Sequence, residues 1–233
     1  NDKIIPSPSL DPGQIIEGKA KRTLANRSMA EAVTYSFLSS QHALLFGGGK
    51  DELKLVNPIS SDLDEMRPSI IPNLISAALK NSNMGNSDIA IFEVGPQYAD
   101  ASAEGQQVVA AGIRTGQTTA RHWSNVSRSV DVFDVKGDVV ALLEVLAVPV
   151  ANLQTTVDAP NWYHPGRSGV LRLGPNALAY FGEIHPTVLR AMSVDYPIMA
   201  FEVFLNNLHS PRSKGPNRAL LKLEPLPVSY THL

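Results

Sequence analysis

The chain has 233 residues, of which 43% are hydrophobic and 18% charged, and its formal net charge is −2. This composition is ordinary for a globular protein, and the length allows a substantial core. The small net charge provides no global basic field for nucleic acid or an anionic membrane, and no apolar run reaches the roughly 18–20 residues of a membrane span. The chain has no cysteine, which excludes disulfides and thiolate metal sites and fits a reducing compartment, so we expect a cytoplasmic protein.

The first quarter of the chain combines a linker with short elements. Residues 1–13 contain Pro6, Pro8 and Pro12, so we expect a linker from an upstream domain. Apolar residues at every fourth position predict a helix over 14–29. Further elements are expected as a strand at 32–39, a short helix at 41–46 and a strand at 53–58.

The segment RPSIIPNLISAALKN at 67–81 predicts a helix with a wide apolar stripe. Pro72 fits in the first helical turn, where backbone N–H groups have no intrahelical acceptor. We therefore expect the helix to begin near Ile70 and to end at 83–85. Such a stripe suits the core of one chain as well as an interface between two chains. Its members are Ile70, Ile71, Leu74, Ile75, Ala78 and Leu79.

The rest of the chain alternates strands and helices. We expect, in chain order, strands at 89–98 and 107–115, a helix at 132–146, a hairpin at 169–184 that turns at 174–176, a short helix whose first turn holds Pro186, and a strand at 198–205. Strands that form hairpins and meanders, with helices between them, predict an α+β fold. Its mostly antiparallel sheet is flanked by helices.

Seven stretches carry a resemblance to one family. They are EAVTYSF, LVNPISSDLDEMRPSIIPNL, IFEVGPQY, VFDVKG, HPGRSG, YFGEIHP and AFEVFLNNL, in that order. With them the chain resembles the β subunits of bacterial phenylalanyl-tRNA synthetases over residues 3–226. The resemblance implies a class II synthetase-like core over 14–208 that copies the catalytic fold of the α subunit but carries no catalytic residues. It also implies that 209–233 is a linker and the truncated start of a C-terminal anticodon-binding domain.

The same resemblance implies that this chain binds no ATP. Active class II enzymes hold the ATP phosphates with the arginines of an Arg-x-Glu and a Gly-x-Gly-x-x-Arg signature. The strand IAIFEVGPQY has Phe92 and Val94 beside Glu93 and no arginine, and MAFEVFLNNL has neither the glycines nor the arginine. An uncompensated triphosphate would be strongly unfavourable. We therefore interpret Glu93 as a structural carboxylate that pairs with backbone donors or an arginine, and Arg67 is the candidate.

The resemblance places a further set of residues around the pocket that corresponds to the active site. The stretch HPGRSG at 164–169 is either a phosphate-binding turn that uses Arg167 or, as we favour, a tight turn into the hairpin, because it has only two glycines and no following helix. A metal triad is the weaker interpretation of His185 and its neighbours, because His185 precedes Pro186 and suits a helix cap. The pseudo-active-site set is Glu93, His164, Gly166, Arg167, Glu183 and His185, and the triad would comprise His164, Glu183 and His185.

Two polar groups have plain interpretations. Ser60, Ser61, Asp62 and Asp64 suit a polar loop and cap before the helix at 67–81 better than nucleophile chemistry. The basic residues of the first helix suggest a solvated face more than an RNA contact. They are Lys19, Lys21, Arg22 and Arg27.

The resemblance also implies partners. The interface with them would be formed by Arg67, Ile70, Ile71, Leu74, Ile75 and Ala78. The partners are the α subunit, a second β subunit in an (αβ)2 tetramer, and tRNA through the holoenzyme, which uses ATP and Mg²⁺ while this chain binds no cofactor or metal. The alternative is a stand-alone adenylate-forming or metal-dependent enzyme that uses Arg167, Glu183 and His185. A plain RNA-binding module is disfavoured by the net charge and the 6% aromatic content.

Overall fold

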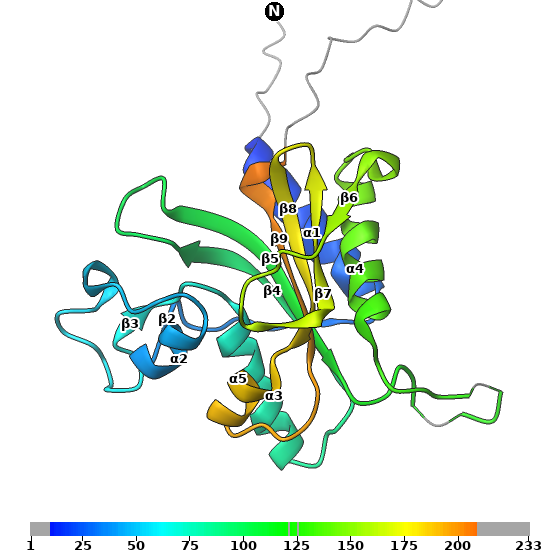
Figure 1. Cartoon of the computed structure of the whole chain (residues 1–233), viewed down its shortest axis with the longest axis horizontal. Coiled ribbons are helices and arrows are strands. Elements are labelled where there is room, and N and C mark those ends of the chain that lie inside the picture. Colours follow the sequence, from blue (N-terminus) through cyan, green and yellow to red (C-terminus); the bar gives the residue numbers. More distant parts are fainter. Residues whose placement is uncertain (1–9, 121, 125, 209–233) are drawn as a thin grey trace, which may run out of the picture.

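The computed structural model describes residues 10–120, 122–124 and 126–208. Its centre is a seven-stranded sheet with the strand order β1-β4-β5-β9-β8-β7-β6 (Figure 1). The strands are β1 (Ala30–Glu31), β4 (Ile89–Tyr98), β5 (Gln106–Thr115), β6 (Gln154–Thr156), β7 (Tyr163–Leu173), β8 (Asn176–Ile184) and β9 (Met199–Phe204). Within the described residues only β1 and β4 pair in parallel, and all other named strand pairs are antiparallel. The predicted α+β fold with a mostly antiparallel sheet is confirmed.

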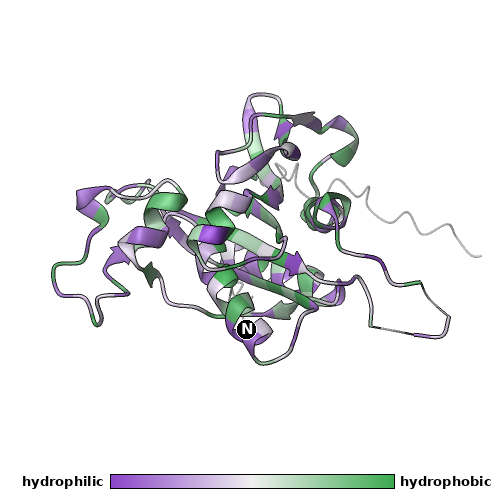
Figure 2. Ribbon diagram, turned by 60° about the horizontal axis from the view of Figure 1, so that its bottom comes forward, coloured by the Kyte–Doolittle hydropathy of each residue, from purple (hydrophilic) through white to green (hydrophobic). Residues whose placement is uncertain are grey.

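Helices cover both faces of the sheet, because successive strand residues point to opposite sides. Helices α1 (Pro12–Asn26) and α4 (Val132–Val145) pack on one apolar cluster, which includes Phe92 and Phe201. Helices α3 (Ile71–Asn83) and α5 (Pro186–Ala191) pack on the opposite cluster, which includes Val109 and Ala111. Figure 2 shows apolar residues along the central strands and on the helices that cover them. None of the helices in the described part is long and apolar enough to cross a membrane.

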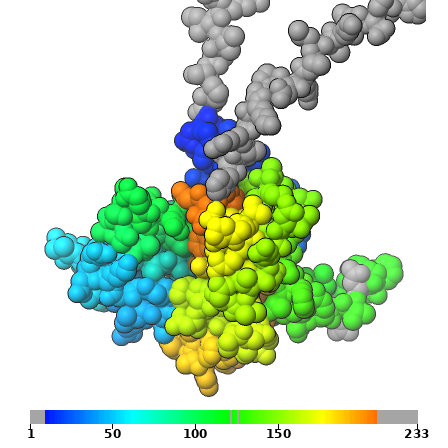
Figure 3. Space-filling model, turned by 45° about the horizontal axis from the view of Figure 1, so that its top comes forward, coloured from blue at the N-terminus to red at the C-terminus, as the bar shows by residue number. Residues whose placement is uncertain are grey.

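Two parts of the chain project from this body on opposite sides (Figures 1 and 3). One is the lobe, residues 37–66, with the strand pair β2 (Phe37–Leu38) and β3 (Glu65–Met66), the helix α2 (Ser40–Leu45) and the short helix η1 (Asp51–Leu53). The other is the arm, residues 116–130, whose base is closed by the bond from the Val130 N–H to the Gly116 carbonyl, 3.0 Å. The short helices η2 (Val150–Asn152) and η3 (Leu205–Asn207) complete the elements.

Most predicted elements are confirmed, and two strands are not. The helix expected from near Ile70 to 83–85 runs from Ile71 to Asn83, and the hairpin turns between Leu173 and Asn176. The strand expected at 32–39 is wrong except for Phe37–Leu38, and the one expected at 53–58 is replaced by η1 and a single bridge at Lys54. At 32–39 the carbonyls of Tyr35 and Ser36 accept from Asn73 and from the Arg67 N–H, and at 53–58 the backbone pairing is limited to Lys54 and Leu55 with residues 64 and 65.

The stretch HPGRSG is not the tight turn that its glycines predicted. It belongs to β7, where the pairing with β8 shifts register between Tyr163 and Ser168. Gly182 on β8 permits this irregularity, because a Cβ there would lie 2.4 Å from the Ser168 Cβ and 2.7 Å from the Arg167 carbonyl oxygen. The predicted linker over 1–13 also ends early, since α1 begins at Pro12, and residues 1–9 and 209–233 lie outside the described residues.

Candidate functional site

Glu93 forms a buried ion pair with Arg67, as the sequence predicted. The Arg67 Nη1 lies 2.8 Å from the Glu93 Oε1, and the two residues are 1% and 4% exposed. A buried charge is tolerated only when it is paired and hydrogen-bonded, and this carboxylate is both. The second Glu93 oxygen accepts the Thr34 hydroxyl at 2.6 Å. Both carboxylate oxygens of Glu93 therefore have partners within the chain.

Every side of the Arg67 guanidinium meets the chain. Its Nε donates to the Pro96 carbonyl at 2.8 Å, and Nη1 also donates to the Thr34 hydroxyl at 3.0 Å. Its Nη2 lies over Gly95, where an added Cβ would come within 2.9 Å of it. The glycine in β4 thus makes room for the arginine, and Arg67 has no face left for a phosphate.

A second buried carboxylate, Glu202 on β9, was missed by the sequence interpretation. It is fully buried and accepts hydrogen bonds from the Ser69 hydroxyl at 2.7 Å and from the Tyr163 hydroxyl at 3.1 Å. Burial raises the pKa of Glu202 above its ordinary value, and these two hydrogen bonds only partly oppose that rise. Burial and the neighbouring Glu202 raise the pKa of Tyr163 well above its ordinary value. The sequence signal was a glutamate inside the apolar run MAFEVF, which resembles the setting of Glu93.

The other members of the pseudo-active-site set gather at the paired ends of β7 and β8. Arg167 holds Glu183 with two contacts, Nε to Oε2 at 2.6 Å and Nη2 to Oε1 at 2.9 Å. The His164 Nδ1 accepts the Gly166 N–H at 3.1 Å, and the rings of His164 and His185 stack with centroids 6.1 Å apart. The predicted set is therefore divided, because β5 and β9 lie between β8 and β4, the strand that carries Glu93.

The geometry does not support a metal triad in this cluster. His185 caps α5 by accepting the Thr187 N–H on Nδ1 at 3.2 Å, and Glu183 is taken by Arg167. Among the described residues no group of three or more His, Cys, Asp or Glu side chains is placed to hold a metal ion. The arginine of the cluster is matched by a carboxylate, so these residues offer neither a ligand set nor a free phosphate clamp.

The apolar stripe of α3 belongs to this chain's own core. Ile70, Ile71, Leu74, Ile75 and Ala78 are all fully buried, in the cluster beneath α3 and α5. Side chains without exposed area have none to offer a partner, so burial in this core accounts for the stripe. The predicted interface role of Arg67 and the stripe residues stays a prediction. The open side of α3 carries other residues at helical spacing, which are Asn73, Ser76, Ala77 and Lys80.

That open side of α3 forms one wall of a groove. The groove has a volume of about 1170 Å³, and its other walls are the lobe and the segment that leads into it. Its lining residues are Val33, Thr34, Tyr35, Phe37, Leu38, Ser39, Ser40, Gln41, His42, Ser61, Asp62, Leu63, Asp64, Pro72, Asn73, Ser76, Ala77 and Lys80. The loop predicted as a polar loop and cap before the helix at 67–81 contributes here. It does not cap α3, whose N-cap residue Ile70 has no side-chain cap bond, and Asp64 instead accepts the Ser40 N–H at the start of α2, 2.7 Å.

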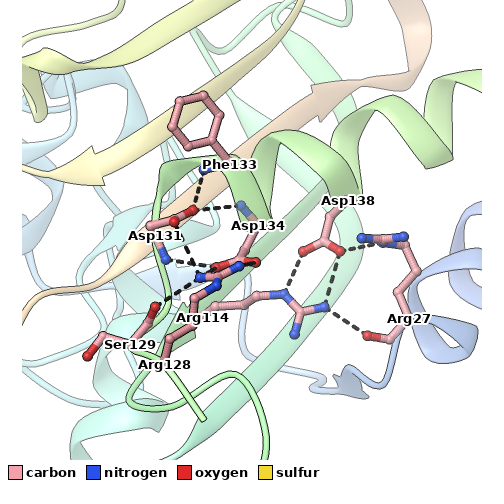
Figure 4. Close-up of polar contacts among 8 residues, drawn as sticks. All are labelled: Arg27, Arg114, Arg128, Ser129, Asp131, Phe133, Asp134 and Asp138. Atoms are coloured by element: carbon pink, nitrogen blue, oxygen red, sulfur yellow. Dashed lines mark hydrogen bonds and ion pairs between the residues drawn. The ribbon is translucent and has the colours of Figure 1, made fainter. Parts of the chain in front are cut away.

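A charge network ties α1, β5 and the arm to α4 (Figure 4). Asp138 of α4 is fully buried and pairs with the Arg27 Nε and with the Arg114 Nε, the latter at 2.6 Å. Arg114 also donates to the Arg27 carbonyl at 2.8 Å. Arg128 of the arm holds Asp134 through Nη2 at 2.6 Å. Arg27 departs from the plain solvated face predicted for it: 37% of its side chain is exposed, but its guanidinium neutralises a buried carboxylate.

Comparison with known proteins identifies relatives over nearly the whole chain. The family model described as the phenylalanyl tRNA synthetase beta chain CLM domain matches residues 3–205. The chain is 50% identical over 222 residues to the phenylalanine–tRNA ligase beta subunit of Rhodospirillum rubrum, and 46% identical over 226 residues to that of Paramagnetospirillum magneticum. Each match covers 95% of this chain and 28% of the relative, so the chain spans little more than a quarter of these relatives.

A similar fold occurs in solved structures of another synthetase. A pyrrolysyl-tRNA synthetase from Desulfitobacterium hafniense superposes with a TM-score of 0.62 over 83% of this chain and 66% of that one, at 16% identity. At that identity the likeness concerns the fold alone, and it agrees with a class II synthetase-like core. The family model covers most of the chain, and the relatives are identical at about half of the aligned positions. The chain therefore belongs to the family of the phenylalanyl-tRNA synthetase β chain CLM domain.

Proposed function

We propose that this chain is the non-catalytic core of a phenylalanyl-tRNA synthetase β subunit, and that it scaffolds the catalytic α subunit for the ATP-dependent charging of tRNA with phenylalanine. The observation that carries the proposal is the burial of Arg67, whose Nε and Nη1 donate to groups of its own chain. In a family built on a catalytic fold, Arg67 beside the central strands is buried and bonded to Glu93, Thr34 and the Pro96 carbonyl. It is not open to a phosphate. A core built in this way supplies shape and surface.

ATP and Mg²⁺ belong, in this proposal, to the holoenzyme. A triphosphate needs several cationic or N–H donors that face it. Arg67 is buried and donates through Nε and Nη1 to its own chain, and Arg167 is matched by Glu183. The residues of the pseudo-active-site set therefore do not fit the nucleotide, and no step of the reaction is assigned to this chain.

The partners follow from the same proposal. They are the α subunit, a second β subunit in an (αβ)2 tetramer, and tRNA bound through the holoenzyme, in the cytoplasm. The predicted core domain over 14–208 is extended at its start to Pro12, where α1 begins, with a linker before it and with 209–233 as a linker and the start of a further domain. The open side of α3 is the part of the predicted interface helix that faces outward, and it is offered to a partner.

The first test is assembly. The full-length β chain that contains this segment is co-expressed with its α chain, and the product is measured by size-exclusion chromatography with light scattering. We expect a stable complex with the mass of two α and two β chains, and aminoacylation only when both are present. A β chain that elutes alone and ignores α contradicts the scaffold function.

The second test separates scaffolding from catalysis. Arg167→Ala removes the exposed arginine of the β7–β8 cluster, and the assembled complex should keep its aminoacylation rate within about twofold, because no interaction with the transition state is lost. Loss of activity by a hundredfold or more, with the complex still intact by light scattering, contradicts a non-catalytic chain and favours an enzymatic role.

A further inference from the structure

The segment 33–36, between β1 and β2, has no regular secondary structure but is held firmly from inside. The Tyr35 carbonyl accepts the Asn73 Nδ2 at 2.9 Å, and the Ser36 carbonyl accepts the Arg67 N–H at 3.0 Å. Thr34 is fixed between Arg67 and Glu93 by the two hydrogen bonds of its hydroxyl. The inward side of this segment is thus bonded to a buried ion pair and to α3.

The side chains on either side of Thr34 lie in solvent. Val33 is 87% exposed and Tyr35 is 66% exposed, and both line the groove beside α3. Thr34 is half-buried between two exposed neighbours, so the bonds that fix Thr34 also restrict the positions of Val33 and Tyr35. Two apolar side chains are therefore displayed in a predetermined arrangement.

The arm displays apolar side chains in a different way. Trp123 is 93% exposed, but the arm is held at its base, by bonds such as that from the Thr118 N–H to the Arg128 carbonyl at 2.9 Å. Each rotamer-rich side chain that is immobilised on binding costs about 0.5–1.5 kcal/mol, so an anchor positioned in advance by its own chain binds at a lower cost. Segment 33–36 is ordered by Arg67, Glu93 and Asn73 before any partner arrives.

We infer that Tyr35, with Val33 beside it, anchors the contact of this chain with the α subunit, and that the buried Arg67–Glu93 pair positions this anchor. The inference rests on the proposed function and names the surface through which it acts. Tyrosine is enriched among residues that dominate interfaces, because its ring buries a large area at low entropic cost while its hydroxyl keeps a polar partner.

The extent of the surface supports a subunit as the occupant. Eighteen residues line the groove, close to the about 20–30 residues that each side contributes to a stable interface. A further exposed apolar residue, Ile59, lies in the lobe close in sequence to the lining residues Ser61–Leu63. Exposed apolar side chains rimmed by polar ones are typical of an interaction site. The α chain should present an apolar recess for the tyrosine ring and a hydrogen-bonding group for its hydroxyl.

The experiment measures the affinity of the full-length β chain for the α chain by biolayer interferometry. Tyr35→Ala should weaken binding at least about thirtyfold, the level of an interface hot spot. Tyr35→Phe should weaken it much less, because the ring is kept. Trp123→Ala is the matched control, a more exposed aromatic residue on the arm, and should change the affinity by less than about twofold. Both exposed positions leave the core intact, which circular dichroism checks.

A second variant tests the positioning role. Thr34→Val removes the hydroxyl between Arg67 and Glu93 but keeps a β-branched side chain, and we expect weaker α binding mainly through slower association with the unchanged Tyr35. If the wild-type chains form no complex, the proposed function fails. If they form a complex that Tyr35→Ala leaves within twofold, or that Trp123→Ala weakens as much, the anchor is overturned while the scaffold function stands.

Discussion

At the residue scale, the strongest constraint is the pairing of Arg67 with Glu93. Replacing Arg67 by Met leaves the carboxylate buried without a cation, which typically costs about 3–5 kcal/mol of unfolding free energy. The double variant Arg67→Met, Glu93→Gln should recover part of this loss, because no unpaired charge remains. Urea denaturation of the wild type, the two single variants and the double variant measures the coupling free energy between the two side chains. Strictly additive losses would contradict a direct ion pair.

Gly95 supplies the space in which the guanidinium lies. Gly95→Ala would place a Cβ 2.9 Å from the Arg67 Nη2. The arginine has to shift against its hydrogen bonds, so we expect a loss of about 1–3 kcal/mol of unfolding free energy by urea denaturation. Gly166→Ala is the control, because the nearest atom to its added Cβ lies 3.7 Å away. Equal effects of the two substitutions would contradict the packing argument.

Glu202 should make stability depend on pH in the direction opposite to that of a salt-bridged carboxylate. Its pKa is raised in the folded state by burial, so the folded chain binds a proton that the unfolded chain releases first. Stability from this group is complete below its ordinary pKa of 4.5 and is lost as pH rises through the raised value. Glu202→Gln lacks this titration. Its unfolding free energy minus that of the wild type should therefore become more positive as pH rises.

The measurement is urea denaturation of both proteins from about pH 4 upward. Glu104→Gln, at an exposed position of the loop between β4 and β5, is the control and should follow the wild type. A difference between the Glu202 variant and the wild type that stays constant with pH would contradict a raised pKa at this position.

At the element scale, α1 is attached to the body by the charge network of α4. Asp138→Asn leaves Arg27 and Arg114 without their shared carboxylate, and Arg114 spans between β5 and the end of α1. We expect hydrogen exchange of the α1 amides to accelerate more than that of α3, because only α1 uses this tether. Asp134→Asn, which frees Arg128 of the arm, should leave α1 unchanged. Uniform acceleration across all helices would contradict a local role.

The long elements were predictable because each has its own signal. The Asp131 side chain accepts the Phe133 N–H, and the Asp134 side chain accepts the Asp131 N–H. The start of α4 therefore follows from local sequence. The strand expected at 32–39 was wrong for the opposite reason. Its apolar pattern is that of a strand, but the donors for its carbonyls come from Arg67 and Asn73, more than 30 positions away, which no local pattern encodes.

The candidate site shows the same division. Pairing of Glu93 with Arg67 was predictable, because a carboxylate in an apolar strand requires a partner. Asp138 was missed, although it follows the quoted stretch VFDVKG, because an aspartate at a helical position usually faces solvent. The groove was also missed, since its walls come from α3, the lobe and the segment 33–36, which are brought together only by the fold.

At the scale of the whole molecule, both apolar clusters share the same strands. Leu74 lies in the cluster under α3 and Leu142 in the cluster under α4, on opposite faces of one sheet. Leu74→Ala and Leu142→Ala should each cost about 2–5 kcal/mol, and each should lower the unfolding midpoint of both faces together. Hydrogen exchange of α3 and α4 along a urea series reports the two faces. Separate transitions would contradict a single cooperative body.

The edge of the sheet beside β4 has a consequence for solubility. Strand β1 pairs only with Ile91 and Phe92, so within the described part of the chain most of the outer edge of this ten-residue strand lacks a neighbouring strand. Arg67 covers it instead. Its Nε donates to the Pro96 carbonyl, and its backbone carbonyl accepts the Tyr98 N–H at 2.9 Å. Pro96 has no N–H to offer. Arg67→Met would remove the side-chain bond to Pro96 while the backbone bond to Tyr98 remains, so part of the outer edge of β4 would become open to pairing with another chain, the arrangement that templates aggregation.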